Sequence, residues 1–112
     1  CGINAYTAII GCRNGAILEH ELFKRTVSEL SAELAMILSE AGYHEDSDKI
    51  EMRIRQVAAR TSNNISSMLQ DVKAARPTEI EAINGFAVKF ASQKGIDTPI
   101  NSMLAEKVRD LQ

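Results

Sequence analysis

Apolar residues recur along most of this chain at steps of three and four residues, and they seldom alternate one by one with polar residues. Steps of three and four place side chains on one face of an α-helix, whereas alternation would indicate β-strands. The clearest stretch runs from about Glu21 to Ala41, and Gly42 follows it at a position where helices commonly end. Its apolar residues are Phe23, Val27, Leu30, Leu34, Ile37 and Leu38. The pattern predicts an all-α fold.

Local start and stop signals divide the chain into about six predicted helices. Thr78 and Glu81 match a capping box, in which each side chain bonds the backbone N–H of the other residue. Pro77 closes one helix, and Pro99 fits the first turn of another. Gly11–Gly15 is a predicted turn. The predicted helices are Cys1–Ile10, Glu21–Ala41, Lys49–Arg60, Ser66–Ala75, Thr78–Gly95 and Pro99–Leu111, each to within a few residues.

Length and composition fit one domain over residues 1–112, because 112 residues with 45% apolar content are enough for a hydrophobic core. Cys1 opens directly into an apolar run without a capping sequence, as in a segment of a longer chain. That run, Ile3–Ile10, is too short to span a bilayer and lacks a basic start, so a soluble cytoplasmic protein is expected. A net charge of −2 with mixed signs argues against nucleic acids and membranes as partners.

The residue types that hold metals and nucleotides are sparse. Cys1 and Cys12 would lie about 16 Å apart on one helix, too far for a disulfide within it. His20 and His44 stand alone among charged residues, so no metal site is predicted and both are interpreted as surface or helix-end residues. No G-x-G-x-x-G sequence or P-loop occurs. The chain alone is not expected to bind a dinucleotide in the usual way.

Short amide and hydroxyl side chains, followed by a carboxylate, interrupt a helical pattern at Asn64–Asp71. Polar groups against a core cost about 1–3 kcal/mol each unless they find partners, so a substrate or cofactor is one candidate partner. On a helical wheel Asn64, Ser67 and Asp71 share a face that is free to meet a ligand. If a helix begins near Asn64, its unpaired N–H groups suit a carboxylate. An N-cap on a surface helix explains the same residues, and spacing leaves both interpretations open.

Glu79 falls on the helical face that also carries Ile83, Phe86 and Phe90, which is the apolar face of its predicted helix. A carboxylate on a buried apolar face needs a cation or a hydrogen-bond donor beside it. A helix-start acid that the macrodipole stabilises needs no such partner. The pattern does not decide between these two roles.

Two asparagines near the start of the chain are further candidates. Asn4 shares a face with Ala8 and Gly11, small residues that let another element or a ligand approach closely. Asn14 precedes Gly15, a pair that turn formation alone explains.

Taken together and in order, these motifs strongly resemble the C-terminal helical domain of the ketopantoate reductase (2-dehydropantoate 2-reductase) family. The resemblance covers nearly the whole chain. Its motifs are Asn4-x-x-Thr7-Ala8, Cys12-Arg13-Asn14-Gly15, Asn64–Asp71, Arg76-Pro77-Thr78-Glu79-Ile80, Ile83-Asn84-Gly85 and Gly95-Ile96-x-Thr98-Pro99-x-Asn101. The resemblance implies a helical domain like that of 6-phosphogluconate dehydrogenases, next to an N-terminal Rossmann domain that is absent from this chain. It further implies that the Rossmann domain holds NADPH, which delivers hydride to ketopantoate. The product would be pantoate, for pantothenate and coenzyme A synthesis. A homodimer is a possible assembly of the family.

The resemblance also implies roles for individual residues. The expected substrate-binding residues are Asn4, Asn14, Asn64, Ile65, Ser66 and Ser67, with Ser67 the partner of the keto-acid carboxylate. Glu79 is expected beside the cofactor and a catalytic lysine, which it would orient. That lysine would lie eight residues before Asn4, outside this chain, so the isolated chain is expected to be inactive. A reductase of another 2-keto acid and a non-catalytic helical binding or dimerisation module are the alternatives.

Overall fold

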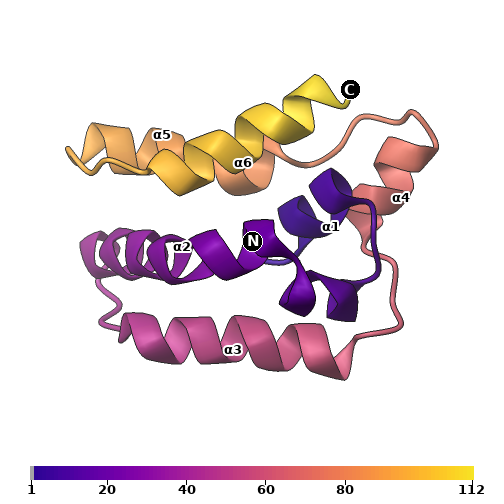
Figure 1. Ribbon diagram of the computed structural model, residues 1–112. Coiled ribbons are helices and arrows are strands. Elements are labelled where there is room, and N and C mark those ends of the chain that lie inside the picture. Colours follow the sequence, from indigo (N-terminus) through magenta and orange to yellow (C-terminus); the bar gives the residue numbers. More distant parts are fainter. Residues whose placement is uncertain (1) are drawn as a thin grey trace.

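The computed structural model describes residues 2–112, and Figure 1 shows that this part of the chain consists of helices and their connections. No β-strand occurs among these residues, so the predicted all-α class is confirmed. The elements are α1 (Asn4–Ile10), the 3₁₀ helix η1 (Asn14–Glu19), α2 (Glu21–Glu40), α3 (Ser47–Arg60), α4 (Ser67–Lys73), the π turn η2 (Glu81–Gly85), α5 (Phe86–Gln93) and α6 (Pro99–Asp110). The expected helix start at Cys1 lies outside the described residues.

Helix α2 occupies the centre of the fold. In Figure 1, α3 lies along one side of α2 and α6 along the other, while α1 and α4 pack together beyond its N-terminal end. The apolar stripe of α2 is buried at Phe23, Val27 and Leu30. The ring of Tyr6 in α1 meets Phe23 edge-on with centroids 5.1 Å apart, and the Tyr6 and Thr26 hydroxyls hydrogen-bond at 2.6 Å. Burial raises the pKa of Tyr6, against the lowering effect of this hydrogen bond. These contacts fix α1 against α2.

The 3₁₀ helix η1 begins at Asn14, within the predicted turn at Gly11–Gly15, and was not itself predicted. It is six residues long, and only Asn14 and Ile17 within it are buried. A segment this short leaves no periodic pattern of apolar residues, so the sequence shows the turn but not the helix.

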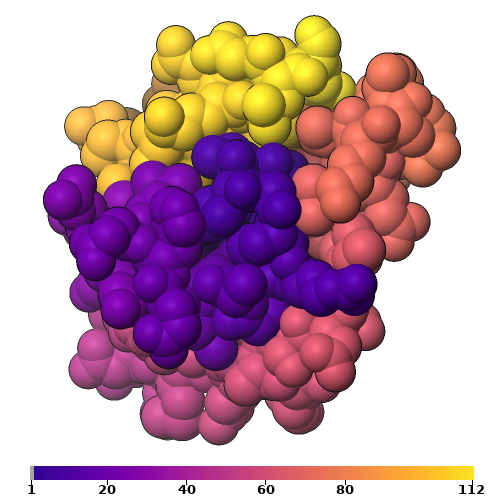
Figure 2. All heavy atoms as spheres, turned by 45° about the vertical axis from the view of Figure 1, so that its right-hand side comes forward, coloured from indigo at the N-terminus to yellow at the C-terminus, as the bar shows by residue number. Residues whose placement is uncertain are grey.

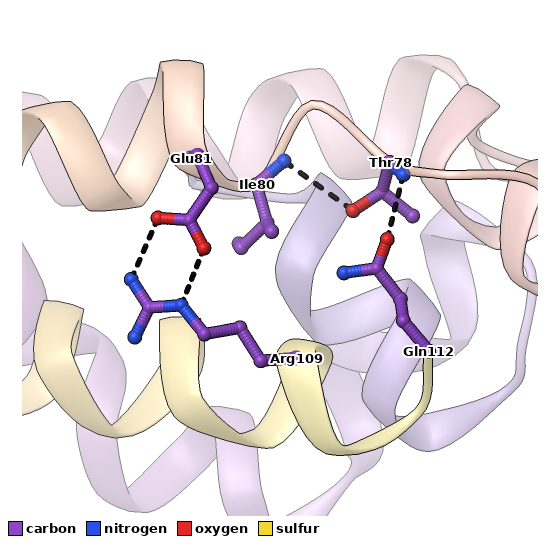
Figure 3. A network of polar contacts seen from close by, with 5 residues as sticks. All are labelled: Thr78, Ile80, Glu81, Arg109 and Gln112. Carbon is purple, nitrogen blue, oxygen red and sulfur yellow. Dashed lines mark hydrogen bonds and ion pairs between the residues drawn. The ribbon is translucent and has the colours of Figure 1, made fainter.

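The predicted capping box at Thr78 and Glu81 is wrong. The carboxylate of Glu81 binds the guanidinium of Arg109 in α6, and the N–H of Thr78 donates to Oε1 of Gln112 at 2.8 Å (Figure 3). Thr78 still accepts a hydrogen bond at its hydroxyl, from the N–H of Ile80 at 3.3 Å. A bidentate pair of charged groups is stronger than a bond between a carboxylate and one backbone N–H, so Arg109 outcompetes the cap.

The two histidines lie where the sequence predicted. His20 is the N-cap of α2, where its Nδ1 accepts from the N–H of Leu22 at 3.1 Å, and His44 is exposed. Within residues 2–112 no group of three potential metal-ligating side chains is found.

None of the described helices combines the length and the apolar composition that crossing a bilayer requires.

Ala75, between α4 and Pro77, has a φ of +56°, and it is the one non-glycine residue described with positive φ. This left-handed conformation costs an L-residue about 1–2 kcal/mol, whereas glycine adopts it freely. Ala75→Gly should therefore raise the free energy of unfolding by about 0.5–1 kcal/mol, after the extra freedom that glycine gives the unfolded chain is subtracted. Urea denaturation measures this difference.

The neighbouring residue is a matched control. Ala74 has an ordinary φ of −91°, so Ala74→Gly gains nothing from relief of strain and should lower stability. Equal effects of the two substitutions would contradict the assignment of strain to Ala75.

Candidate functional site

Three of the residues singled out in the sequence meet at one small cavity. Asn4 comes from α1, Ser67 from the first turn of α4, and Glu79 from the segment that leads into η2. Figure 2 shows the first helix, in indigo, in contact with the salmon segment that contains α4. The cavity has a volume of about 130 Å³ and is lined by Asn4, Ser67, Met68, Asp71, Glu79 and Ile83. Typical ligand pockets measure about 300–1,000 Å³, so this one suits a small molecule or one end of it.

The two neighbouring serines of α4 have different surroundings. Ser66 is buried and is the N-cap of α4, because its Oγ accepts from the N–H of Leu69 at 3.1 Å. The same oxygen hydrogen-bonds the hydroxyl of Thr7 in α1 at 2.5 Å. Ser67 is exposed, and its hydroxyl bonds none of the described residues. Ser66 therefore fastens α4 to α1, and Ser67 is left free at the cavity.

Asn14, Asn64 and Ile65 do not line this cavity. Asn14 is buried, its N–H donates to the carbonyl of Asn64 at 3.0 Å, and its Nδ2 donates to Oγ1 of Thr61 at 2.9 Å. Gly15 bonds the same loop through its N–H to the carbonyl of Ser62 at 3.1 Å. A Cβ on Gly15 would lie 2.4 Å from Cβ of Ser62, so only glycine permits this approach. The start of η1 thus holds the loop that leads into α4.

The carboxylates at the cavity differ in their partners. Asp71 is paired with Arg76, whose Nε lies 3.0 Å from Oδ1. Glu79 is exposed, and its carboxylate makes no ion pair or hydrogen bond with any residue in the range 2–112. The carboxylate of Glu79 is therefore free to form an ion pair with a cation that enters the cavity.

The predicted burial of the face that carries Glu79 is wrong. Phe86 is 63% exposed and stacks on Phe90 with ring centroids 6.4 Å apart. The core side of this segment instead carries Ile80, Asn84, Ala87 and Ala91. These buried positions follow one another at steps of four and three residues, so the core face lies about 100° from the face that the helical wheel selected.

The pair between Glu81 and Arg109 ties η2 to α6 on the outside of the molecule, with Nε to Oε2 at 2.5 Å and Nη2 to Oε1 at 2.8 Å (Figure 3). The hydrogen bond from Arg109 lowers the pKa of Glu81 below its ordinary value of 4.5. The pair should therefore stabilise the fold fully above about pH 4.5 and lose its effect as the pH falls through the lowered pKa.

Thermal melts of the wild type and Glu81→Gln between pH 7 and pH 2 check this. The difference between the two melting temperatures should be constant near neutral pH and vanish in acid. It should also narrow in high salt, because the pair is exposed. A difference that persists at pH 2 would show that the pair is not its source.

A buried polar network was missed in the sequence. Glu33 in α2 is 6% exposed, and its two carboxylate oxygens accept from the N–H groups of Ile100 at 2.7 Å and Asn101 at 2.9 Å, at the start of α6. Nδ2 of Asn101 also donates to Glu33 at 2.8 Å, and Nδ2 of Asn84 donates to Oδ1 of Asn101 at 3.0 Å. The sequence feature that could have indicated this network is the position of Glu33, three residues after Leu30 on the edge of the apolar stripe of α2.

Comparison with known sequences identifies the family. Residues 1–112 match the profile described as "Ketopantoate reductase PanE/ApbA C terminal". The chain belongs to this family. One relative, the 2-dehydropantoate 2-reductase of Salmonella typhimurium, is 39% identical over 109 residues, which make up 97% of this chain and 35% of that protein. The chain thus spans little more than a third of the length of that ketopantoate reductase.

Solved structures agree with the family. The probable 2-dehydropantoate 2-reductase of Bacillus subtilis matches with a TM-score of 0.86 and 32% identity, over 99% of this chain and 37% of that one. A D-mandelate dehydrogenase, solved with NADH and anilino(oxo)acetate, gives a TM-score of 0.90 at 21% identity, over 98% of this chain and 61% of that one. The second match shows a shared fold alone.

Proposed function

We propose that this chain is the substrate-binding helical domain of an NADPH-dependent 2-dehydropantoate 2-reductase, which reduces ketopantoate to pantoate in pantothenate and coenzyme A synthesis. One observation carries the proposal: Asn4, Ser67 and Glu79, which come from three separate segments, line the same small cavity. The 39% identity to a 2-dehydropantoate 2-reductase supports the choice of substrate.

Different residues of this chain bind the substrate and orient it. The free hydroxyl of Ser67 donates to the carboxylate of the keto acid, and the amide of Asn4 bonds a polar group further along the substrate. Asn14, Asn64, Ile65 and Ser66 act on the substrate through the loop and cap that hold Ser67 in place. Positioning of this kind contributes to rate because the reacting groups meet already oriented.

Glu79 acts on a cation. Its exposed and unpaired carboxylate suits the ammonium of a lysine from upstream of this chain, which would protonate the oxygen of the reduced carbonyl. The same exposed carboxylate also suits a hydrogen bond from the cofactor. When bound to an N-terminal Rossmann domain, NADPH supplies the hydride.

The full-length reductase that contains this chain should therefore oxidise NADPH when ketopantoate is added, and the isolated 112-residue chain should not. The isolated chain lacks both the proposed proton donor and the hydride source. Absorbance of NADPH measures both reactions. Oxidation of NADPH by the isolated chain would contradict the proposal that the active site is formed by two domains.

The same assay separates the alternatives. A higher kcat/KM with an aryl 2-keto acid than with ketopantoate would favour a reductase of another substrate. No turnover of any 2-keto acid by the full-length protein would favour a binding or dimerisation module. We expect the enzyme to be cytoplasmic. A homodimer would cover apolar side chains such as Phe86, which is 63% exposed here.

A further inference from the structure

The π turn η2 changes the direction in which the chain before it points. The N–H of Gly85 donates to the carbonyl of Ile80, five residues back, at 2.9 Å, whereas an α-helix would bond it to Glu81. A π turn holds one extra residue, and residues of an α-helix follow one another at about 100° around the axis. Residues before the turn are thus rotated by about that angle relative to α5. Glu79 is one of these residues.

Two contacts with α6 hold the π turn from opposite sides. On the inside, Asn84 is fully buried and donates to Asn101. On the outside, Glu81 pairs with Arg109 (Figure 3). A Cβ on Gly85 would lie 2.6 Å from Oε1 of Glu81, so glycine leaves the space in which Glu81 turns toward α6.

The buried contact has a fixed hydrogen-bond direction. Both oxygens of Glu33 already face N–H donors at the start of α6, so Nδ2 of Asn101 donates to Glu33 and its Oδ1 faces Asn84. Asn84 must then present its Nδ2, which leaves its own buried Oδ1 without a partner among the described residues. An unpaired buried acceptor costs about 1–3 kcal/mol, so stability alone does not explain an asparagine at this position.

We infer that Asn84 is a positioning residue for Glu79, and this inference rests on the proposed function of Glu79. The carbonyl of Glu79 accepts from the N–H groups of Ala82 at 3.0 Å and Ile83 at 3.1 Å, so Glu79 lies in the helical turn that leads directly into the widened segment. Glu79 and Ile83 both line the cavity. By holding the π turn, Asn84 fixes the angle at which the carboxylate of Glu79 meets the cavity. Without this contact the segment would return to α-helical geometry and turn Glu79 away.

A double-mutant cycle in the full-length reductase tests the inference. Asn84→Leu keeps the number of side-chain heavy atoms and removes the amide. It should lower kcat by about tenfold to a hundredfold, the scale of a misplaced catalytic group, and leave KM for ketopantoate nearly unchanged. In the Glu79→Ala background it should lower kcat no further, because Asn84 acts only through Glu79. The same factor in both backgrounds, or an unchanged kcat in the wild-type background, would overturn the inference.

Controls separate positioning from folding. Ser31→Ala also removes a buried polar group, since Ser31 is 1% exposed and its hydroxyl donates to the carbonyl of Val27 at 2.8 Å. Because Ser31 lies in α2, its substitution should leave kcat unchanged. If Asn84→Leu does not fold, Asn84→Ala takes its place in the cycle.

A crystal structure of the Asn84 variant gives a readout that does not depend on activity. The N–H of Gly85 should bond the carbonyl of Glu81, and Glu79 should have left the cavity. A retained π turn would overturn the inference. If Glu79→Ala alone leaves kcat unchanged, the proposed role of Glu79 fails, and this structure still decides whether Asn84 holds the turn.

Discussion

Glu79→Ala in the full-length reductase should lower kcat by about tenfold to a thousandfold, with a smaller change in KM for ketopantoate. Glu79 is proposed to orient a lysine whose interaction with the carbonyl oxygen strengthens as negative charge develops there. Loss of such an interaction acts on the transition state more than on the bound substrate. Steady-state kinetics measures both parameters, and a titration with NADPH shows whether cofactor affinity falls as well.

Ser67→Ala is the matched comparison at the same cavity. The substrate carboxylate carries the same charge before and during the reaction, so loss of the Ser67 hydroxyl should mainly raise KM. Thermal melts of both variants control for folding, since each residue lies near the start of a helical segment. Normal kinetics for a folded Glu79→Ala variant would leave this glutamate without a role in the reaction.

Glu33→Ala should lower the free energy of unfolding by about 1–3 kcal/mol, the scale of buried polar groups left without a hydrogen-bond partner. The substitution leaves the N–H groups of Ile100 and Asn101, and the amide of Asn101, without their acceptor at the buried start of α6. Glu33→Gln keeps one acceptor oxygen and should cause an intermediate loss. Urea denaturation of the full-length reductase measures the difference.

Glu29 provides the control for this substitution. It lies on the exposed side of the same helix, so Glu29→Ala removes a charge from α2 without disturbing a buried contact. Its effect should stay within about 0.5 kcal/mol. If Glu33→Ala is as mild as Glu29→Ala, the network at the start of α6 does not contribute to stability.

Much of the fold follows from local pattern. The apolar stripe at Phe23, Val27 and Leu30 predicts α2, and Pro99 marks the start of α6, because these signals depend only on residues within a few positions. The grouping of Asn4, Ser67 and Glu79 followed from the family resemblance rather than from spacing. Residue types alone had left each of the three with a structural explanation.

The features that the sequence did not show depend on distant partners. Glu33 bonds residues 67 and 68 positions further along, and no local window contains both ends of that contact. The π turn likewise contacts distant residues, since Asn84 bonds Asn101 and Glu81 pairs with Arg109 in α6.

The bond between Thr7 and Ser66 joins residues that are 59 positions apart, and it closes the wall between α1 and α4. Closing so long a loop is entropically unfavourable until most of the intervening chain is ordered. No short stretch of the sequence can therefore form the cavity during folding, because its walls come from α1, α4 and the segment that leads into η2. The cavity should form late, after α2 and α3 have paired, and local opening of α4 should remove it before the rest of the domain unfolds.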